Sequence, residues 1–253
     1  MKELPFISCK TTTYGRVKTL EESIHSFLIQ DYPADKCELI IVNDYPEQKL
    51  IFDHPQVKIY NLDETFPILG EKENYAIERC NGDIIAVWDD DDLALSNHLQ
   101  NIADHWREDT NIIHWETAVL FNEPDSIAIT SVGNSGIAYS KDAWEKIGRS
   151  PSENAGGDMT MVFRIYELGG RLNVKMKNEQ AAWFYCWGGR SYHQSGQGTD
   201  TDDRPSCVVR HSEYIESERQ KGNIPTGDVY LAPKWNKDYA KMFKEHLEKL
   251  NAQ

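Results

Sequence analysis

The 253-residue chain has a formal net charge of −14, with 40% hydrophobic and 27% charged residues. That balance is ordinary for a globular protein with a sizeable core, and the negative field disfavours nucleic acid as the main partner. No apolar run approaches the roughly 20 residues that cross a bilayer, and we expect no signal peptide. Five scattered cysteines form no disulfide or metal framework, so we expect a reducing, cytoplasmic environment.

The first hundred residues alternate short apolar runs with amphipathic segments. Apolar residues three or four positions apart predict helices at 17–30 and 70–82, each with one buried face. Strands are expected at 5–9, 37–44, 55–63 and 83–88. Alternating units of this kind predict an α/β fold with a mostly parallel sheet flanked by helices, in which ligands bind at the carboxyl ends of the strands.

The second half of the chain is less regular. A helix is expected at 96–106, with Ser96 as its N-cap. The helix expected at 158–170 places on one side Met159, Val162, Phe163 and Tyr166. A short helix is expected at 140–148, and strands at 111–121, 126–132, 135–140, 171–176 and 181–187. Glycine and small polar residues from Gly188 to Asp203 predict a flexible segment near the site.

Four consecutive aspartates, Asp89 to Asp92, follow the apolar run 84–88. Adjacent carboxylates repel one another, so the fold must supply a counter-charge. Carboxylates at the end of a buried strand favour a hard cation, Mg²⁺ or Mn²⁺, with open positions for phosphate oxygens. A solvated acidic turn is the alternative. A helix-loop-helix calcium site would need alternating ligands and a glycine, and a phosphatase-like aspartyl nucleophile would normally follow the first strand rather than the fourth.

Three stretches carry a more specific signal. The opening "ISCKTTTYGRVKTLEESIHSFLIQDYP" joins a strand, a Thr-Tyr-x-Arg turn and a helix, and "ELIIVNDYPEQ" supplies a second strand with a polar end. In "GEKENYAIERCNGDIIAVWDDDD" a helix leads to the strand that ends in the aspartates. Together these stretches resemble the family 2 glycosyltransferases of the GT-A fold, with its DxD motif. The resemblance covers about the first hundred residues well and the rest loosely.

The resemblance implies a GT-A, Rossmann-like domain of the nucleotide-diphospho-sugar transferase type. We expect a single domain over 1–235, with a nucleotide-binding half at 1–107 and an acceptor-binding half at 108–235. Residues 236–253 are expected to form an amphipathic, lysine-bearing C-terminal helix. That helix either packs on its own domain or contacts a membrane surface or a partner.

The resemblance also implies roles for the polar residues of the first half. The turn at 12–14 and Asp44 would hold the nucleobase, with Asp44 accepting its ring N–H. Asp89 and Asp90 would face the nucleoside, Asp91 would bind the metal and Asp92 would orient the loop. The implied donor-binding residues are Thr12, Thr13, Tyr14, Arg16, Asp44, Lys72, Asn74, Asp89, Asp90 and Arg190. For Lys72 and Asn74 a core or surface role is the alternative, and the family often has an arginine where this chain has Glu73.

In the second half, the family places a general base at the start of a helix, usually in a Glu-Asp pair. The counterpart here is Asp158, with Gly157 in place of the acidic neighbour. Asp158 could equally serve as a helix N-cap. His193 would complete the metal shell and Arg190 would pair with phosphate, whereas a solvated loop histidine is the alternative.

The sequence therefore predicts an inverting, Mn²⁺- or Mg²⁺-dependent transfer of a sugar from a nucleotide-diphosphate sugar, best a UDP-sugar, to a hydroxyl acceptor. The acceptor class is a carbohydrate or a lipid-linked glycan. Two alternatives stay open. One is a sugar-nucleotidyltransferase, for which "KTTTYGR" is a poor triphosphate loop, and the other is a catalytically inactive homologue that binds a nucleotide or a carbohydrate.

Overall fold

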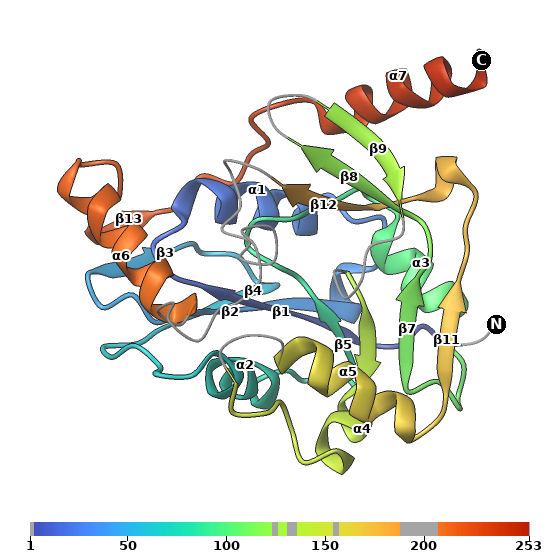
Figure 1. Cartoon of the computed structure of the whole chain (residues 1–253), viewed down its shortest axis with the longest axis horizontal. Coiled ribbons are helices and arrows are strands. Elements are labelled where there is room, and N and C mark those ends of the chain that lie inside the picture. The colour runs from blue at the N-terminus through green and yellow to red at the C-terminus, as the bar shows by residue number, and fades with distance from the viewer. Residues whose placement is uncertain (1–2, 123–125, 131–135, 154–156, 188–206, 253) are drawn as a thin grey trace.

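The computed structural model describes residues 3–122, 126–130, 136–153, 157–187 and 207–252 (Figure 1). Its centre is a seven-stranded sheet in the order β11-β7-β10-β5-β1-β2-β4. The strand bounds are Ile7–Thr13 (β1), Cys37–Asn43 (β2), Val57–Asn61 (β4), Ile84–Val87 (β5), Ile112–Trp115 (β7), Ala138–Ser140 (β10) and Arg171–Val174 (β11). β1, β2, β4 and β5 are parallel, whereas β10 is antiparallel to β5 and β7. The predicted mostly parallel α/β sheet is confirmed.

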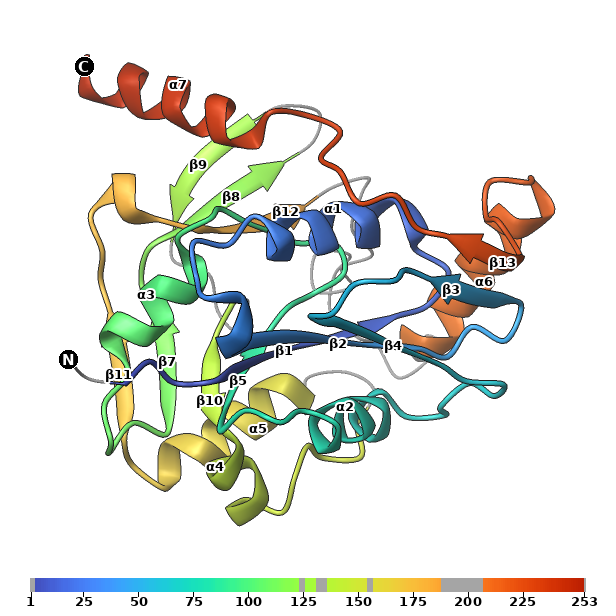
Figure 2. The ribbon, with the colours of Figure 1, turned by 180° about the vertical axis from the view of Figure 1, so that it is seen from behind.

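Helices cover both faces of this sheet (Figures 1 and 2). One face carries α1 (Val17–Leu28) and α3 (His98–His105), and the other carries α2 (Leu69–Glu78), α4 (Lys141–Lys146) and α5 (Gly157–Glu167). The core divides accordingly: Ile7 of β1 packs with Leu20 of α1 in one buried cluster, and Ile85 of β5 lies with Ile77 and Trp144 in the other. Burial of apolar surface on both faces is what a parallel sheet requires.

Two smaller sheets complete the described part of the chain. One has the order β6-β12-β8-β9, with bounds Leu93–Ala94, Trp183–Trp187, Ala118–Asn122 and Ser126–Thr130. The other pairs β3 (Gln48–Ile51) with β13 (Gly227–Tyr230). The remaining helices are α6 (Cys207–Gln220) and α7 (Tyr239–Asn251), with short 3-10 turns at Ala34–Lys36 and Asn178–Gln180.

The segment before α7 crosses helix α1 and is bonded to it. The buried carboxylate of Glu22 accepts hydrogen bonds from the Tyr239 hydroxyl at 2.8 Å and the Asn236 N–H at 2.7 Å. The Trp235 indole donates to the Ser26 hydroxyl at 2.9 Å. Helix α7 then packs Tyr239 and Phe243 into the cluster formed by the second sheet. The C-terminal helix is therefore present, and its apolar side packs on its own domain.

Several expected elements differ in detail from those observed. The run 111–121 divides into β7 and β8, because the first strand joins the central sheet and the second joins the smaller one. Ser96 is not the N-cap of α3: Asn97 occupies that position, and the Ser96 hydroxyl donates to the Asp31 carboxylate at 2.5 Å instead. The short strands β3, β6 and β13 were not expected, because two to four residues give no readable period.

The buried face of α5 also differs from the expectation. Its buried residues are Met161, Val162 and Ile165. Met159 and Phe163, which the periodicity places inside, are 39% and 56% exposed. The helix offers two overlapping apolar stripes that share Val162, and contact with the α4 side of the core selects the one that contains Ile165.

None of the helices in the described ranges combines the length with the apolar character needed to cross a bilayer.

An aromatic cluster lies behind the aspartate segment and contains a buried histidine. His98 is 2% exposed, and its ring lies 4.9 Å from Trp183, 5.8 Å from Trp88 and 5.9 Å from Trp115, centroid to centroid. Its Nε2 has no hydrogen-bond partner among the described residues. Burial therefore lowers the pKa of His98 to about 3.

This burial predicts a loss of stability in mild acid. The unfolded chain takes up a proton at His98 near pH 6.5, whereas the folded chain does not until about pH 3. The free energy of unfolding should thus fall by about 2 kcal/mol from this residue between pH 7.5 and 5. Urea unfolding gives the free energy of unfolding of wild type and of His98→Leu at both pH values. The difference between the two proteins should change by the contribution of His98 between the two pH values. His246→Gln, on α7, is the control, and an unchanged difference for His98→Leu would contradict the assignment.

Candidate functional site

The carboxyl ends of β1, β2 and β5 meet at one edge of the central sheet. The register pairs Thr13 with Asn43 across β1 and β2, and Lys10 with Val87 across β1 and β5. The segments that follow these strands, 14–16, 44–45 and 88–92, are therefore neighbours. The polar stretches predicted to form one site are brought together by the parallel register.

Arg16 is the counter-charge for two of the aspartates. Its Nη1 donates to Asp91 Oδ2 at 2.8 Å and its Nε to Asp90 Oδ2 at 3.1 Å, while Nη2 bonds the other oxygen of Asp90. Burial alone would lower the pKa of Arg16, but the two carboxylates raise it above its ordinary value. The planar fork of an arginine suits such a two-point contact with a carboxylate.

Asp89 lies in a different environment from its neighbours. Burial raises the pKa of its carboxyl to about 7, with Lys10 opposing and Asp91 adding to the rise. Lys10 itself donates to Glu73 Oε1 at 2.5 Å. Burial also raises the pKa of Asp90, although Arg16 opposes it. The carboxylates of Asp89 to Asp91 therefore lie close enough to influence one another, and Arg16 and Lys10 are the cations that oppose the rise in pKa.

Asp92 bonds strand β12 rather than Arg16. Its Oδ2 accepts from the Trp183 indole at 3.0 Å, and its Oδ1 accepts from the Cys186 N–H at 2.8 Å. Burial raises the pKa of Asp92 well above its ordinary value. These contacts agree with the orienting role expected for Asp92.

A second ion pair lies at the end of β2. Lys72 of α2 donates to Asp44 Oδ1 at 2.5 Å and to the Thr13 carbonyl at 2.7 Å. The other oxygen of Asp44 accepts from the Phe66 N–H at 2.9 Å. The ring of Tyr14 lies 6.0 Å from the Lys72 ammonium. Burial lowers the pKa of Lys72, although Asp44 opposes the shift.

The remaining predicted residues are distributed more widely. Thr12 is partly exposed at the end of β1. Asn74 lies on α2, where its amide bonds the backbone of Ser150 and the Trp144 indole. Asp158 is an exposed residue in the first turn of α5, and it contributes weakly to the charge environment of Lys10. Arg190 and His193 lie outside the described residues.

The pair formed by Lys10 and Glu73 was not predicted from the sequence. The sequence feature that indicates such a pair is the lysine in the middle of the strand "ISCKTTT", where an apolar residue is usual. Lys10 is 3% exposed, so the fold must supply a buried partner. Glu73, noted only as a departure from the family's arginine, is that partner.

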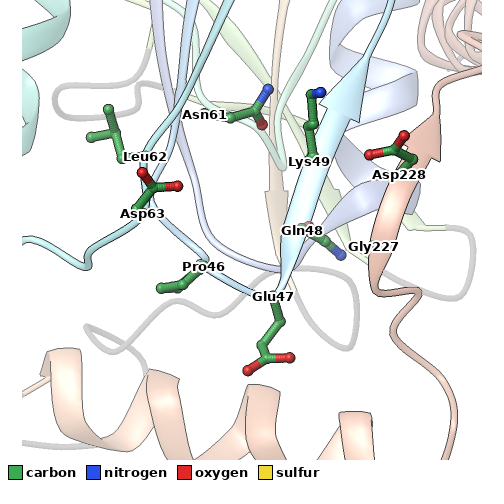
Figure 3. Close-up of a pocket in the computed structure, with 9 residues that line it drawn as sticks. All are labelled: Pro46, Glu47, Gln48, Lys49, Asn61, Leu62, Asp63, Gly227 and Asp228. Atoms are coloured by element: carbon green, nitrogen blue, oxygen red, sulfur yellow. The ribbon is translucent and has the colours of Figure 1, made fainter.

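A groove of about 370 Å³ lies beside the site, between β3 and β13 (Figure 3). Figure 3 shows Lys49 and Asp228 on the two neighbouring strands, with Asn61 and Asp63 opposite. It contains none of the predicted site residues. Asn61 is already bonded to the backbone of Leu50, so this part of the lining has a structural role.

The aspartate segment fits an open metal site rather than a closed one. Among the described residues, no group of three or more His, Cys, Asp or Glu side chains is arranged to enclose a metal ion. Mg²⁺ and Mn²⁺ sites that take phosphate oxygens need only one or two carboxylates from the protein. The Asp91 carboxylate, which lies at this edge of the sheet between Asp90 and Asp92, is the residue that would meet that requirement.

Comparisons with known proteins identify the family. Residues 8–150 match the family model described as glycosyl transferase family 2. Since this match covers more than half of the chain, the chain belongs to family 2 of the glycosyltransferases. A comparison with curated protein sequences gave no match.

Solved structures share the fold at low sequence identity. The S. aureus TarS 1–349 structure in complex with UDP-GlcNAc has a TM-score of 0.61 and 15% identity, over 84% of this chain and 66% of that one. The mannosyltransferase PcManGT from Pyrobaculum calidifontis, in complex with GDP-Man and Mn²⁺, has a TM-score of 0.58 and 14% identity, over 88% and 73%. This chain covers 60% of the length of another TarS 1–349 structure. The GT-A type of fold is therefore confirmed.

The contacts of Asp92 predict the effect of Asp92→Asn. An asparagine directs an NH₂ group at either the Trp183 indole or the Cys186 N–H, and leaves that buried donor without an acceptor. The free energy of unfolding should fall by about 1–3 kcal/mol. Urea unfolding measures it, with Asp104→Asn as the matched control, because Asp104 accepts only an exposed contact from Gln100. If Asp92→Asn is as stable as the wild type, the Asp92 carboxylate does not act as the acceptor for both buried donors.

Proposed function

We propose that this glycosyltransferase is an inverting, metal-dependent enzyme that moves a sugar from a UDP-sugar to a hydroxyl group of a carbohydrate or lipid-linked glycan. The observation that carries the proposal is the row of carboxylates from Asp89 to Asp91 at the carboxyl edge of the sheet, of which Asp90 and Asp91 share the guanidinium of Arg16. The scattered cysteines support a reducing, cytoplasmic location.

The nucleobase end of the donor fits the pair formed by Asp44 and Lys72. Each carboxylate oxygen has a second lone pair, so Asp44 can accept the ring N–H of a base. Lys72 uses two of its three N–H donors within the protein and has a third for a neighbouring carbonyl oxygen. Uracil presents an N–H beside such a carbonyl, whereas cytosine presents an unprotonated nitrogen beside an amino group. Thr12, Thr13 and Tyr14 complete this end of the proposed site.

The diphosphate end of the donor fits the aspartate segment. Asp91, with His193, would hold Mn²⁺ or Mg²⁺, which would offset the charge of the departing diphosphate. Asp89 and Asp90 would lie beside the ribose, and Arg190 beside the phosphates. Arg16 keeps the carboxylates of Asp90 and Asp91 in fixed directions, so little reorganisation is needed when a donor binds.

The acceptor is activated on the other side of the sugar. Asp158, proposed as the general base, takes the proton of the acceptor hydroxyl as its oxygen attacks the anomeric carbon. The bond to the diphosphate breaks as the new glycosidic bond forms, so the configuration inverts. Asp158 is exposed at the start of α5, so its carboxylate is accessible to an acceptor.

The two alternatives are less well supported. A sugar-nucleotidyltransferase needs a glycine-rich basic loop after the first strand to hold a triphosphate. Here that turn offers Gly15 alone, and its Arg16 is engaged with two carboxylates. Glu73 and Gly157 are the departures that would suit an inactive homologue, but Glu73 has a partner in Lys10.

Recognition of the base predicts selectivity among nucleotides. UDP should bind at least about tenfold more tightly than CDP, because a hydrogen bond to a charged group contributes about 1.5–3 kcal/mol. Lys72→Met should reduce this preference, because it removes the donor to the carbonyl oxygen of the base and leaves Asp44 as the acceptor of the ring N–H. Isothermal titration calorimetry with UDP and CDP in the presence of Mn²⁺ measures it, with Lys49→Met, an exposed lysine of β3, as the control. Equal affinity of the wild type for both nucleotides would refute this reading of the pair.

Turnover tests the proposed reaction directly. With UDP-sugars, Mn²⁺ and hydroxyl acceptors, the wild type should release UDP, and EDTA should abolish the release. Asp158→Asn should lower kcat by about 10²- to 10⁴-fold, whereas Glu167→Gln at the other end of α5 should not. Binding of UDP without turnover of any nucleotide sugar would favour the inactive homologue.

A further inference from the structure

Helix α2 contacts two parts of the molecule through different side chains. Lys72 and Glu73 reach the sheet edge, where they pair with Asp44 and Lys10. One turn apart on the same helix, Gly70 and Asn74 contact the segment 150–153, which precedes α5. The helix therefore lies between the proposed donor site and the element that carries the proposed base.

Asn74 pairs with Ser150 through both groups of its amide. Its Nδ2 donates to the Ser150 carbonyl at 3.0 Å, and its Oδ1 accepts from the Ser150 N–H at 2.9 Å. The Trp144 indole donates to the same Oδ1 at 3.1 Å. An asparagine matches both the donor and the acceptor of a peptide group, which neither an aspartate nor an apolar residue can do.

Gly70 brings the backbone of α2 close to the same segment. A Cβ at this position would lie 1.9 Å from the Pro151 carbonyl oxygen, a distance that no side chain tolerates. The Gly70 N–H also points to the Glu153 carbonyl at 3.4 Å. Two residues of α2 thus fix the path of 150–153, one by hydrogen bonds and one by close approach.

The fixed segment in turn contacts the first turns of α5. The Ser150 hydroxyl donates to the Met161 sulfur at 3.5 Å, and the Glu153 carboxylate accepts from the Thr160 hydroxyl at 3.1 Å. A Cβ on Gly157 would lie 3.3 Å from the Glu153 Cβ. Asp158 belongs to these same turns, so its position depends on where 150–153 lies.

We propose that Asn74 is a positioning residue that sets Asp158 relative to the donor site and does not bind the donor itself. The inference rests on the proposed function, because it needs Asp158 as the base. It replaces the expected donor contact of Asn74, since each of the contacts above directs the amide toward the segment before α5. A displacement of about 1 Å at a reacting group can lower turnover by about 10²-fold.

The test compares Asn74→Ala with Ser140→Ala. Ser140 caps the neighbouring helix α4 by accepting from the Ala143 N–H at 3.0 Å, so its loss weakens the same region without touching 150–153. Asn74→Ala should lower kcat for UDP release by about 10- to 100-fold and leave the UDP dissociation constant within about twofold of wild type. Hydrogen exchange of the peptide that contains 157–161 should accelerate. Ser140→Ala should keep wild-type kcat.

Each outcome decides the inference. If Asn74→Ala does not fold, Asn74→Asp is measured instead, because it keeps the two accepted bonds and loses the one donated to the Ser150 carbonyl, so kcat should fall in the same direction. Equal losses of kcat and UDP affinity would make Asn74 a donor contact and overturn the inference, as would wild-type kcat in the Asn74 variant. Wild-type kcat in Asp158→Asn would overturn the proposed base and the inference with it. Loss of kcat in Asp158→Asn with wild-type kcat in Asn74→Ala overturns the inference alone.

Discussion

The guanidinium of Arg16 between the carboxylates of Asp90 and Asp91 is the contact on which the site depends. The parallel register brings the acidic segment after β5 next to the turn after β1, and like charges at that distance would repel one another without a cation. Arg16 is the N-cap residue of α1. Its contact with Asp90 and Asp91 therefore ties the start of α1 to the segment that follows β5. The segment that Arg16 holds in this way is the one that we propose to take a divalent cation and a diphosphate.

Buried ion pairs recur around this edge and serve geometry more than stability. Lys10 with Glu73 and Lys72 with Asp44 are nearly inaccessible pairs whose desolvation offsets much of their attraction. Removing one partner of such a pair leaves an uncompensated charge, so the pairs act as strict constraints on how α2 sits over the sheet. That constraint gives α2 one position, from which it contacts both the sheet edge at Lys10 and Asp44 and the segment before α5.

The parts of the fold that could be predicted from sequence are those with long, unambiguous patterns. β2 and β5 are continuous apolar runs, and their polar ends necessarily meet at one edge of a parallel sheet, so Asp44 and Asp89 to Asp92 could be placed together in advance. The buried face of α5 could not, because two stripes share Val162 and only tertiary contact chooses between them. The partner of Asn74 could not either, since Ser150 lies 76 positions away and its backbone has no sequence signature.

The bonds between Glu22 and the segment before α7 bear on the order in which the chain can become native. Helix α1 is synthesised before residues 236–239, so the buried carboxylate of Glu22 obtains the Asn236 N–H and the Tyr239 hydroxyl only after those residues have left the ribosome. Until then the carboxylate must stay hydrated, and the face of α1 that carries it must stay open. The first half of the given sequence, which contains α1, therefore cannot reach its final packing before the segment that precedes α7 is present.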